Sequence, residues 1–240
     1  MSRVALVTGG TRGIGAAVSL ALKAAGRTVV ANFARNEAAA AAFRDAHGIS
    51  VMKFDVCDYD ACKAAVDRIV AEHGPIEIVV NNAGITRDGT MLRMNREMWD
   101  AVIDTNLGSC FNICKLTFEH MRAAKFGRIV NIGSINGQAG QYGQVNYAAA
   151  KSGIHGFTKA LAQEGARFGI TVNAIAPGYV DTEMVRAVPH EVLQKIISNI
   201  PMGRLGHAED IARGVVFLTA DDADFVTGST LSINGGQHMY

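Results

Sequence analysis

The stretch that decides the fold is Thr8-Gly9-Gly10-Thr11-Arg12-Gly13-Ile14-Gly15, between an apolar run at residues 3–7 and helically spaced residues at 14–25. Glycine lets a backbone turn tightly and approach a pyrophosphate, which then rests on the N-terminus of the following helix. The stretch is neither the common G-x-G-x-x-G nor a P-loop, because no Lys-Ser/Thr pair follows it. Its place between a first strand and a first helix favours a dinucleotide site over a purely structural turn.

Beyond this loop, strand and helix patterns alternate to the end of the chain. Apolar runs predict further strands at residues 28–32, 49–54, 78–80, 128–132, 171–176 and 230–233, and helical spacing predicts helices at 37–46, 59–73, 95–124, 147–168, 189–199 and 208–218. The predicted strands are apolar on both faces, as a parallel sheet between two helical layers requires. We therefore predict an α/β fold: one Rossmann-type, doubly wound domain over residues 1–240, with about seven strands and ligands at their carboxyl ends.

The composition excludes several classes of protein. Hydrophobic residues make up 49% and charged residues 19% of the 240, which is enough material for a large core. The formal net charge is +1 without a basic block, so no nucleic-acid partner is expected. No apolar run reaches the roughly 18 residues of a membrane span or looks like a signal peptide, and no close metal-ligand pair occurs. A cytoplasmic protein without a membrane or metal partner is expected.

The segment after the second predicted strand bears on the choice of cofactor. It reads Ala31-Asn32-Phe33-Ala34-Arg35 and has no acidic residue. NAD enzymes place an Asp or Glu near this point to accept a hydrogen bond from the ribose 2′-OH, and such an acid would repel a 2′-phosphate. Arg12 and Arg35 instead offer guanidinium groups, which bind phosphates bidentately. We predict NADP(H) over NAD(H), with two merely solvated arginines as the alternative.

Tyr147-Ala148-Ala149-Ala150-Lys151 places a phenol and an ammonium four residues apart on one helix face. A free tyrosine has a pKa of about 10, and a nearby cation favours the phenolate and lowers that pKa. The spacing alone is common by chance. Here Ser134 lies 13 residues upstream of Tyr147 in a loop after a predicted strand, and Asn106 lies in the predicted helix 95–124.

With Asn81-Asn82-Ala83-Gly84 and Pro177-Gly178, these residues resemble the short-chain dehydrogenase/reductase family over nearly the whole chain. The resemblance implies that Tyr147 is the general acid/base, that Lys151 binds the nicotinamide ribose and lowers the tyrosine pKa, that Ser134 hydrogen-bonds the substrate carbonyl, and that Asn106 holds a water of a proton relay. Together with the glycine loop and the two arginines, the resemblance predicts this set of cofactor contacts: Gly9, Thr11, Arg12, Gly13, Ile14, Gly15, Arg35, Asp55, Val56, Asn82, Ala83, Gly84, Ile85, Tyr147, Lys151, Pro177, Gly178, Val180 and Thr182.

The loop before Tyr147 points to a substrate class. Gln141 and Gln144 are amide donors that could bind an acyl chain with a second carbonyl, or could be ordinary polar loop residues. This loop, residues 84–88 and residues 234–239 look like those of bacterial acetoacetyl-CoA reductases, which make (R)-3-hydroxybutyryl-CoA for polyhydroxybutyrate biosynthesis. That resemblance implies NADPH-dependent reduction of acetoacetyl-CoA, and the family resemblance implies a homotetramer. The segment around residues 180–206, which carries Pro189 and Pro201, is expected to form a lid over the substrate. The resemblance to acetoacetyl-CoA reductases also implies substrate contacts from Asp88, Ser134, Gln141, Tyr142, Gln144, Gly178 and Tyr179.

Two other functions stay open at this point. One is a 3-oxoacyl-acyl-carrier-protein reductase of fatty-acid synthesis, because those enzymes are close relatives of the acetoacetyl-CoA reductases. The other is an NADP(H)-binding regulatory protein that has lost catalysis, although all four catalytic positions are filled here.

Overall fold

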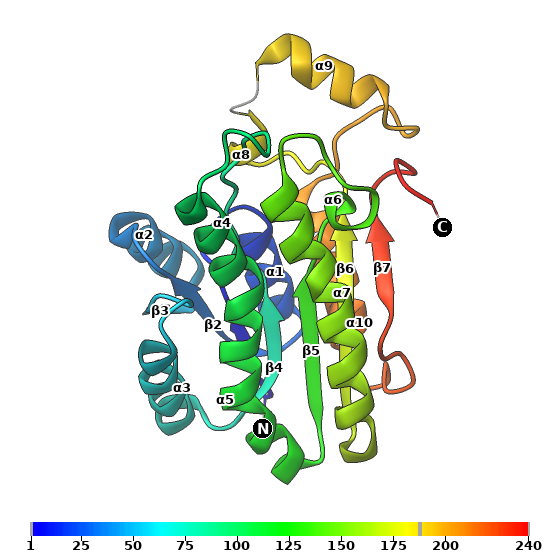
Figure 1. The fold of residues 1–240 in the computed structure, drawn as a ribbon. Coiled ribbons are helices and arrows are strands. Elements are labelled where there is room, and N and C mark those ends of the chain that lie inside the picture. The colour runs from blue at the N-terminus through cyan, green and yellow to red at the C-terminus, as the bar shows by residue number, and fades with distance from the viewer. Residues whose placement is uncertain (1, 187–188, 240) are drawn as a thin grey trace.

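The computed structural model describes residues 2–186 and 189–239, which form a seven-stranded sheet with helices on both faces (Figure 1). All strand pairs are parallel, in the order β3-β2-β1-β4-β5-β6-β7. The strands are β1 (Val4–Val7), β2 (Thr28–Phe33), β3 (Ser50–Lys53), β4 (Ile76–Asn81), β5 (Gly127–Ile132), β6 (Ile170–Pro177) and β7 (Thr230–Ile233). The predicted Rossmann-type sheet is therefore confirmed.

The strand order reverses between β1 and β4. The chain moves from β1 outward to β2 and β3, then returns to β4 on the other side of β1 and moves outward again. In such a sheet the loops at this reversal diverge and leave a crevice, where dinucleotides bind. The glycine stretch after β1 and the segment after β4 therefore flank the same crevice.

Helices cover both faces of the sheet and create two cores. On one face α3 (Tyr59–His73), α5 (Ser109–Ala124) and α7 (Val145–Gly165) pack through residues such as Ile69, Ile113 and Ala162. On the other face α1 (Gly13–Ala24), α2 (Glu37–His47) and α10 (Ala208–Leu218) pack through residues such as Leu22, Phe43 and Val215. The central strands β1, β2, β4, β5 and β6 thus bury side chains on both faces, as the apolar runs predict, whereas the edge strands β3 and β7 are less buried.

The predicted helix at residues 95–124 is interrupted. The structure has α4 (Arg96–Ile103), a five-residue π-helical turn (Asp104–Gly108) and then α5. A single π turn adds one residue to the helical repeat and often marks a functional position. The loop after β5 also contains a short helix, α6 (Ile135–Ala139), which the sequence pattern does not indicate. A 3-10 turn (Ala166–Phe168) extends α7.

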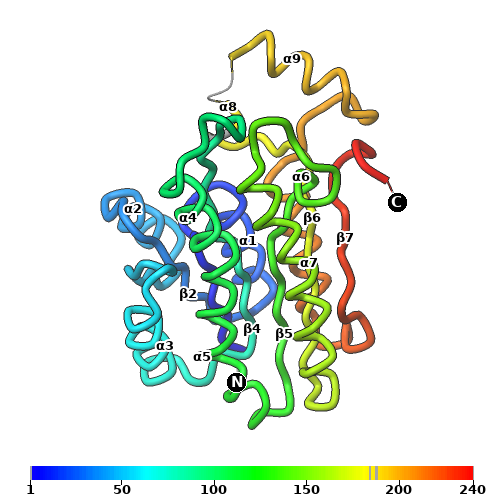
Figure 2. The backbone as a smooth tube through the Cα atoms, in the orientation of Figure 1, coloured from blue at the N-terminus to red at the C-terminus, as the bar shows by residue number. Residues whose placement is uncertain are grey.

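Residues beyond β6 cross above the carboxyl ends of the strands. Figure 1 shows α8 (Glu183–Arg186) and α9 (His190–Ser198) above the arrowheads of the sheet, at the end where ligands bind in this fold, and the tube in Figure 2 follows the same path. This is where the lid is expected, although residues 187 and 188 lie outside the described residues. No helix in the described ranges is long and apolar enough to cross a membrane.

Candidate active site

The two loops that flank the crevice are joined by Thr8, at the end of β1. Its Oγ1 accepts hydrogen bonds from the backbone N–H of Asn82 at 2.9 Å and of Ala83 at 3.0 Å. Asn82 Nδ2 in turn donates to the carbonyls of Thr8 at 2.9 Å and Gly9 at 3.2 Å. The glycine loop and the segment after β4 therefore form one rigid unit. The role of Thr8 is not apparent from the sequence, because its contacts lie 74 residues away along the chain.

The lack of a side chain at Gly15 allows the backbone of α1 to approach Gly9 and Asn82 closely. A Cβ built there would lie 2.1 Å from the Gly9 carbonyl oxygen and 2.6 Å from Asn82 Nδ2. Any side chain would therefore force the loop open. Gly15 lies in the first turn of α1, and this turn carries no acidic residue. An exposed helix N-terminus behind a glycine loop suits a pyrophosphate, so these residues fit the diphosphate of a dinucleotide.

Asn32, at the end of β2, has a different role from the ribose-binding acid of NAD enzymes. It is buried, its Oδ1 accepts from the Gly9 N–H at 3.1 Å, and its Nδ2 donates to the Phe54 carbonyl at 2.9 Å. Asn32 therefore holds the glycine loop to the strand end beyond it. This tie lies outside what the sequence analysis predicts.

The predicted phosphate-binding arginines are both exposed beside this crevice. Arg12, at the N-cap of α1, lies 3.9 Å from Glu183 of α8. Arg35 lies between β2 and α2, and no carboxylate of the described residues lies within ion-pairing distance of it. Asp55, the predicted adenine contact, uses Oδ1 to accept from the Cys57 N–H at 2.9 Å. Val56 packs its side chain in the core, so any cofactor contact there would come from its backbone.

Ser134 and Tyr147 meet at the carboxyl end of β5. Ser134 caps α6, and its Oγ accepts from the Asn136 N–H at 3.1 Å. The Tyr147 side chain projects from the first turn of α7 and lies close enough to this hydroxyl for hydrogen bonding by Ser134 to lower the Tyr147 pKa. The structure therefore brings together the two hydroxyl groups that the sequence pattern pairs.

Lys151 lies one turn beyond Tyr147 and is fully buried. Its Nζ donates to the Ile132 carbonyl at 2.7 Å and lies 5.7 Å from the centre of the Tyr147 ring. A Cβ built on Gly84 would lie 3.6 Å from the same Nζ, so the lysine reaches the segment after β4. Burial lowers the pKa of Lys151 to about 8. Lys151 thus stands between Tyr147 and the crevice, where it can meet a cofactor ribose.

The Tyr147 phenol does not follow the expected pKa direction. Its burial raises the pKa, the hydrogen bond from Ser134 opposes this, and the charges of Asp88 and Tyr179 raise it further. Lys151 is not among the groups that shift it. The predicted lowering of the Tyr147 pKa by Lys151 is therefore wrong, because desolvation of the phenol is the largest effect on that pKa and Lys151 is not among its causes.

Asn106 lies in the π turn behind Lys151 and is buried. Its Oδ1 accepts from the Ile85 N–H at 2.8 Å, and its Nδ2 donates to the Ile85 carbonyl at 3.0 Å. The side chain therefore holds the segment after β4 in place. A water held by Asn106 for a proton relay stays a prediction.

The predicted substrate residues divide into two groups. Gln144 and Asp88 are engaged with each other, with Gln144 Nε2 donating to Asp88 Oδ2 at 2.9 Å. Gln141 and Tyr142 are exposed, the Tyr142 side chain at 86%. Gln141 and Tyr142 are thus accessible to a substrate, whereas Gln144 is already bonded.

The segment after β6 closes the other side of the crevice. Thr182 Cγ2 would lie 3.7 Å from a Cβ built on Gly13, so this segment reaches the glycine loop. Gly178 and Tyr179 line a pocket of about 250 Å³, together with residues of the lid, α10 and β7. The predicted nicotinamide and substrate contacts at residues 177–182 therefore lie between the glycine loop and a cavity. Val180 anchors the segment through a parallel bridge to Gly206.

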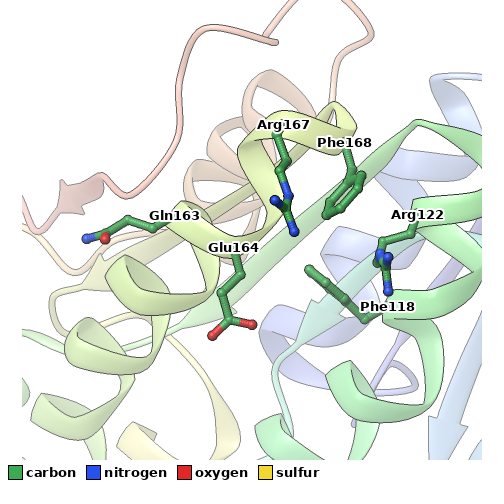
Figure 3. A pocket seen from close by; sticks show the side chains of 6 residues that line it. All are labelled: Phe118, Arg122, Gln163, Glu164, Arg167 and Phe168. Carbon is green, nitrogen blue, oxygen red and sulfur yellow. The ribbon is translucent and has the colours of Figure 1, made fainter.

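A second cavity, of about 300 Å³, lies far from these residues at the C-terminal ends of α5 and α7 (Figure 3). The guanidinium groups of Arg122 and Arg167 lie over the Phe168 ring, 4.6 Å and 4.7 Å from its centre. None of the predicted site residues lines it. In residues 2–186 and 189–239, no three His, Cys, Asp or Glu side chains are grouped to hold a metal ion.

One prediction follows from the charges that face Tyr147. Replacing Asp88 with asparagine removes a negative charge that raises the Tyr147 pKa, so that pKa falls. A carbonyl reductase needs the protonated phenol, and its kcat/KM falls as the pH rises through this pKa. The alkaline limb of the pH profile should therefore move to lower pH in Asp88→Asn. Glu164→Gln, at the far end of α7, is the control; an unmoved or higher limb in Asp88→Asn would contradict the assignment.

The fold and the site together define the class of protein to which this chain belongs. A glycine loop at the sheet reversal, a hydroxyl pair and a buried lysine beside it form the site of an oxidoreductase that uses a nicotinamide dinucleotide. The chain belongs to the short-chain dehydrogenase/reductase family, since a family model described as enoyl-(acyl carrier protein) reductase matches residues 9–238.

Three relatives match over nearly their whole lengths. The acetoacetyl-CoA reductase of Rhizobium meliloti (strain 1021) is 61% identical over 240 residues, which is 100% of both chains. The acetoacetyl-CoA reductase of Shinella zoogloeoides is 60% identical over 238 residues, 99% of both. The 3-oxoacyl-[acyl-carrier-protein] reductase FabG of Escherichia coli (strain K12) is 45% identical over 240 residues, 99% of this chain and 98% of the relative. The predicted family resemblance is thereby confirmed.

Proposed function

We propose that this chain reduces the 3-oxo group of acetoacetyl-CoA to (R)-3-hydroxybutyryl-CoA with NADPH, a step of polyhydroxybutyrate biosynthesis. The observation that carries the proposal is the set Ser134, Tyr147 and Lys151 beside the dinucleotide crevice, in a chain 61% identical to a protein named acetoacetyl-CoA reductase. A silent regulatory protein would not need to keep these groups in contact.

The residues of the site account for the chemistry at the carbonyl oxygen. A bound nicotinamide dinucleotide supplies the hydride. Ser134 donates a hydrogen bond to the carbonyl oxygen, and as that oxygen gains negative charge Tyr147 gives it the phenolic proton. Ser134 is suited to this role, because its Oγ accepts the Asn136 N–H and its own proton remains available to donate. Lys151 is buried beside this pair with its Nζ bonded to the Ile132 carbonyl, and is placed to hold the ribose of the bound dinucleotide.

The preference for NADPH rests on the charge around the end of β2. No acid follows the strand, and the guanidinium of Arg35 is exposed without an ion-pair partner among the described residues. We expect kcat/KM to be higher with NADPH than with NADH. Arg35→Ala should lower the NADPH value by about tenfold or more and leave the NADH value unchanged, as for loss of a charge-assisted hydrogen bond.

Arg68→Ala, on the exposed face of α3, is the matched control for that experiment. Steady-state kinetics with both cofactors and all three proteins give the answer. Equal kcat/KM for the two cofactors, or a preference for NADH, would contradict the proposed specificity.

The carrier of the acyl group decides between the proposal and its alternative. The relatives named for acyl carrier protein are less similar, at 45% identity against 59–61% for three named acetoacetyl-CoA reductases. We expect a higher kcat/KM with acetoacetyl-CoA than with acetoacetyl-acyl-carrier-protein, both followed by NADPH oxidation. The reverse order would assign the chain to fatty-acid synthesis instead.

We also propose a cytoplasmic homotetramer. Large apolar side chains are exposed on α5 (Phe111, 55%), on α10 (Phe217, 56%) and just before β7 (Phe225, 100%). Such exposure suits surfaces that are covered by other subunits. Size-exclusion chromatography with light scattering should give four times the monomer mass, and a monomeric mass would contradict this part of the proposal.

A further inference from the structure

A chain of side-chain hydrogen bonds connects the mouth of the site to Ser134. Gln144 Nε2 donates to Asp88 Oδ2 at 2.9 Å, and Asn136 Nδ2 donates to Gln144 Oε1 at 2.9 Å. The backbone N–H of the same Asn136 donates to Ser134 Oγ at 3.1 Å. This series of hydrogen bonds therefore runs from the exposed carboxylate of Asp88, through the amides of Gln144 and Asn136, to the Ser134 hydroxyl.

The carboxylate fixes the direction of every bond in this chain. A carboxylate only accepts hydrogen bonds, so Gln144 must turn its NH₂ group towards Asp88. Its carbonyl oxygen then faces Asn136, which must donate in turn. Asn136 is thereby held so that its backbone N–H meets Ser134, and the Ser134 proton is left free to point at Tyr147 or at a substrate oxygen.

Backbone contacts run alongside these side chains. The Gly89 N–H donates to the Gly143 carbonyl at 2.8 Å, and Gly89 forms a parallel bridge with Gln144. The buried Asn146 side chain donates to the Arg87 carbonyl at 2.9 Å. Segment 87–89 is therefore bonded to the segment that leads directly into Tyr147, although the two are more than 50 residues apart in the sequence.

We propose that Asp88, Gln144 and Asn136 form a clasp that holds the two loops together and orients Ser134 for hydrogen bonding to the substrate carbonyl. They are positioning residues, and the role of Gln144 is then to hold the site rather than to bind the acyl chain. This inference rests on the proposed reductase function for its kinetic test. It does not depend on which thioester carrier the enzyme prefers.

The clasp can be tested by exchanging the carboxylate and the amide between positions 88 and 144. Gln144→Glu sets two carboxylates against each other where one hydrogen bond stood, so the chain should open. In the double variant Asp88→Asn/Gln144→Glu, the new amide at position 88 can donate to one oxygen of the new carboxylate at position 144, and Asn136 can donate to the other oxygen. Every bond of the clasp is then restored with the same net charge.

We expect Gln144→Glu to lower kcat by roughly tenfold or more with NADPH and a small 3-oxo ester such as ethyl acetoacetate, while KM changes little. The kcat of the double variant should be at least about threefold higher than the kcat of Gln144→Glu. Gln163→Glu, an exposed glutamine at the far end of α7, controls for the added charge. A direct substrate contact by the Gln144 amide would instead raise KM in both variants, without rescue.

A second readout is independent of activity. Hydrogen–deuterium exchange of the peptide that spans residues 84–92 should be faster in Gln144→Glu and should return to the wild-type rate in the double variant. Kinetic recovery of less than about threefold overturns the clasp. A wild type that reduces no 3-oxo compound refutes the proposed function instead, and the exchange rates then decide the clasp: equal rates in the single and double variants overturn it.

Discussion

Tyr147→Phe is expected to lower kcat for carbonyl reduction by about a thousandfold, while the fold and the binding of NADPH stay intact. Phenylalanine keeps the ring that packs at the start of α7 and removes only the hydroxyl that bonds to Ser134 and gives up the proton. Without a positioned acid, the alkoxide would have to take its proton from solvent. The loss should appear in kcat and kcat/KM alike, because the interaction develops only in the transition state.

The measurement is steady-state NADPH oxidation by purified wild type, Tyr147→Phe and Tyr59→Phe. Tyr59 begins α3 on the surface and serves as a matched control for loss of a phenolic oxygen. Circular dichroism and thermal unfolding should give the same fold for all three proteins. A Tyr147→Phe variant that retains a tenth of the activity would refute the assignment of the proton donor.

Gly15→Ala is expected to weaken NADPH binding by about 10- to 100-fold and to lower thermal stability. The new Cβ would lie 2.1 Å from the Gly9 carbonyl oxygen and 2.6 Å from Asn82 Nδ2. Both atoms belong to the hydrogen-bonded unit around Thr8, so neither can move without breaking bonds to the other loop. The loop that should hold the diphosphate would therefore be displaced.

Gly156→Ala is the control for that substitution. Gly156 lies within α7, and a Cβ built there meets nothing within 4 Å. Alanine inside a helix is favoured over glycine by about 1 kcal/mol, so this variant should be as stable as the wild type or more stable. Fluorescence titration gives the Kd for NADPH in each case, and a Gly15→Ala Kd within about threefold of the wild type would contradict the role of this loop.

Much of the fold could be predicted because its signals are local. Short apolar runs separated by helical spacing indicate a parallel sheet, and the observed seven strands follow that pattern closely. The prediction of one helix at residues 95–124 was only partly correct. The spacing of apolar residues cannot show the π turn at Asp104–Gly108, which contains Asn106. A π turn changes the repeat by one residue, which a pattern averaged over several turns does not reveal.

The candidate site could be predicted where residue types and spacings are specific. The pairing of Tyr147 with Ser134 and the nearness of Lys151 agree with the pattern. The contacts of Thr8, Asn32 and Gln144 could not be predicted, because each joins segments brought together only by the folded sheet. The direction of the Tyr147 pKa was wrong for a similar reason, since sequence spacing carries no measure of burial.

The central claim is that Tyr147 protonates a 3-hydroxyl formed with NADPH on acetoacetyl-CoA. The most direct measurement incubates wild type and Tyr147→Phe with both compounds and follows NADPH oxidation together with the chirality of the product. The wild type should form (R)-3-hydroxybutyryl-CoA in step with NADPH oxidation, and the variant should form almost none. Absence of product with the wild type, or equal rates for the two proteins, would contradict the claim.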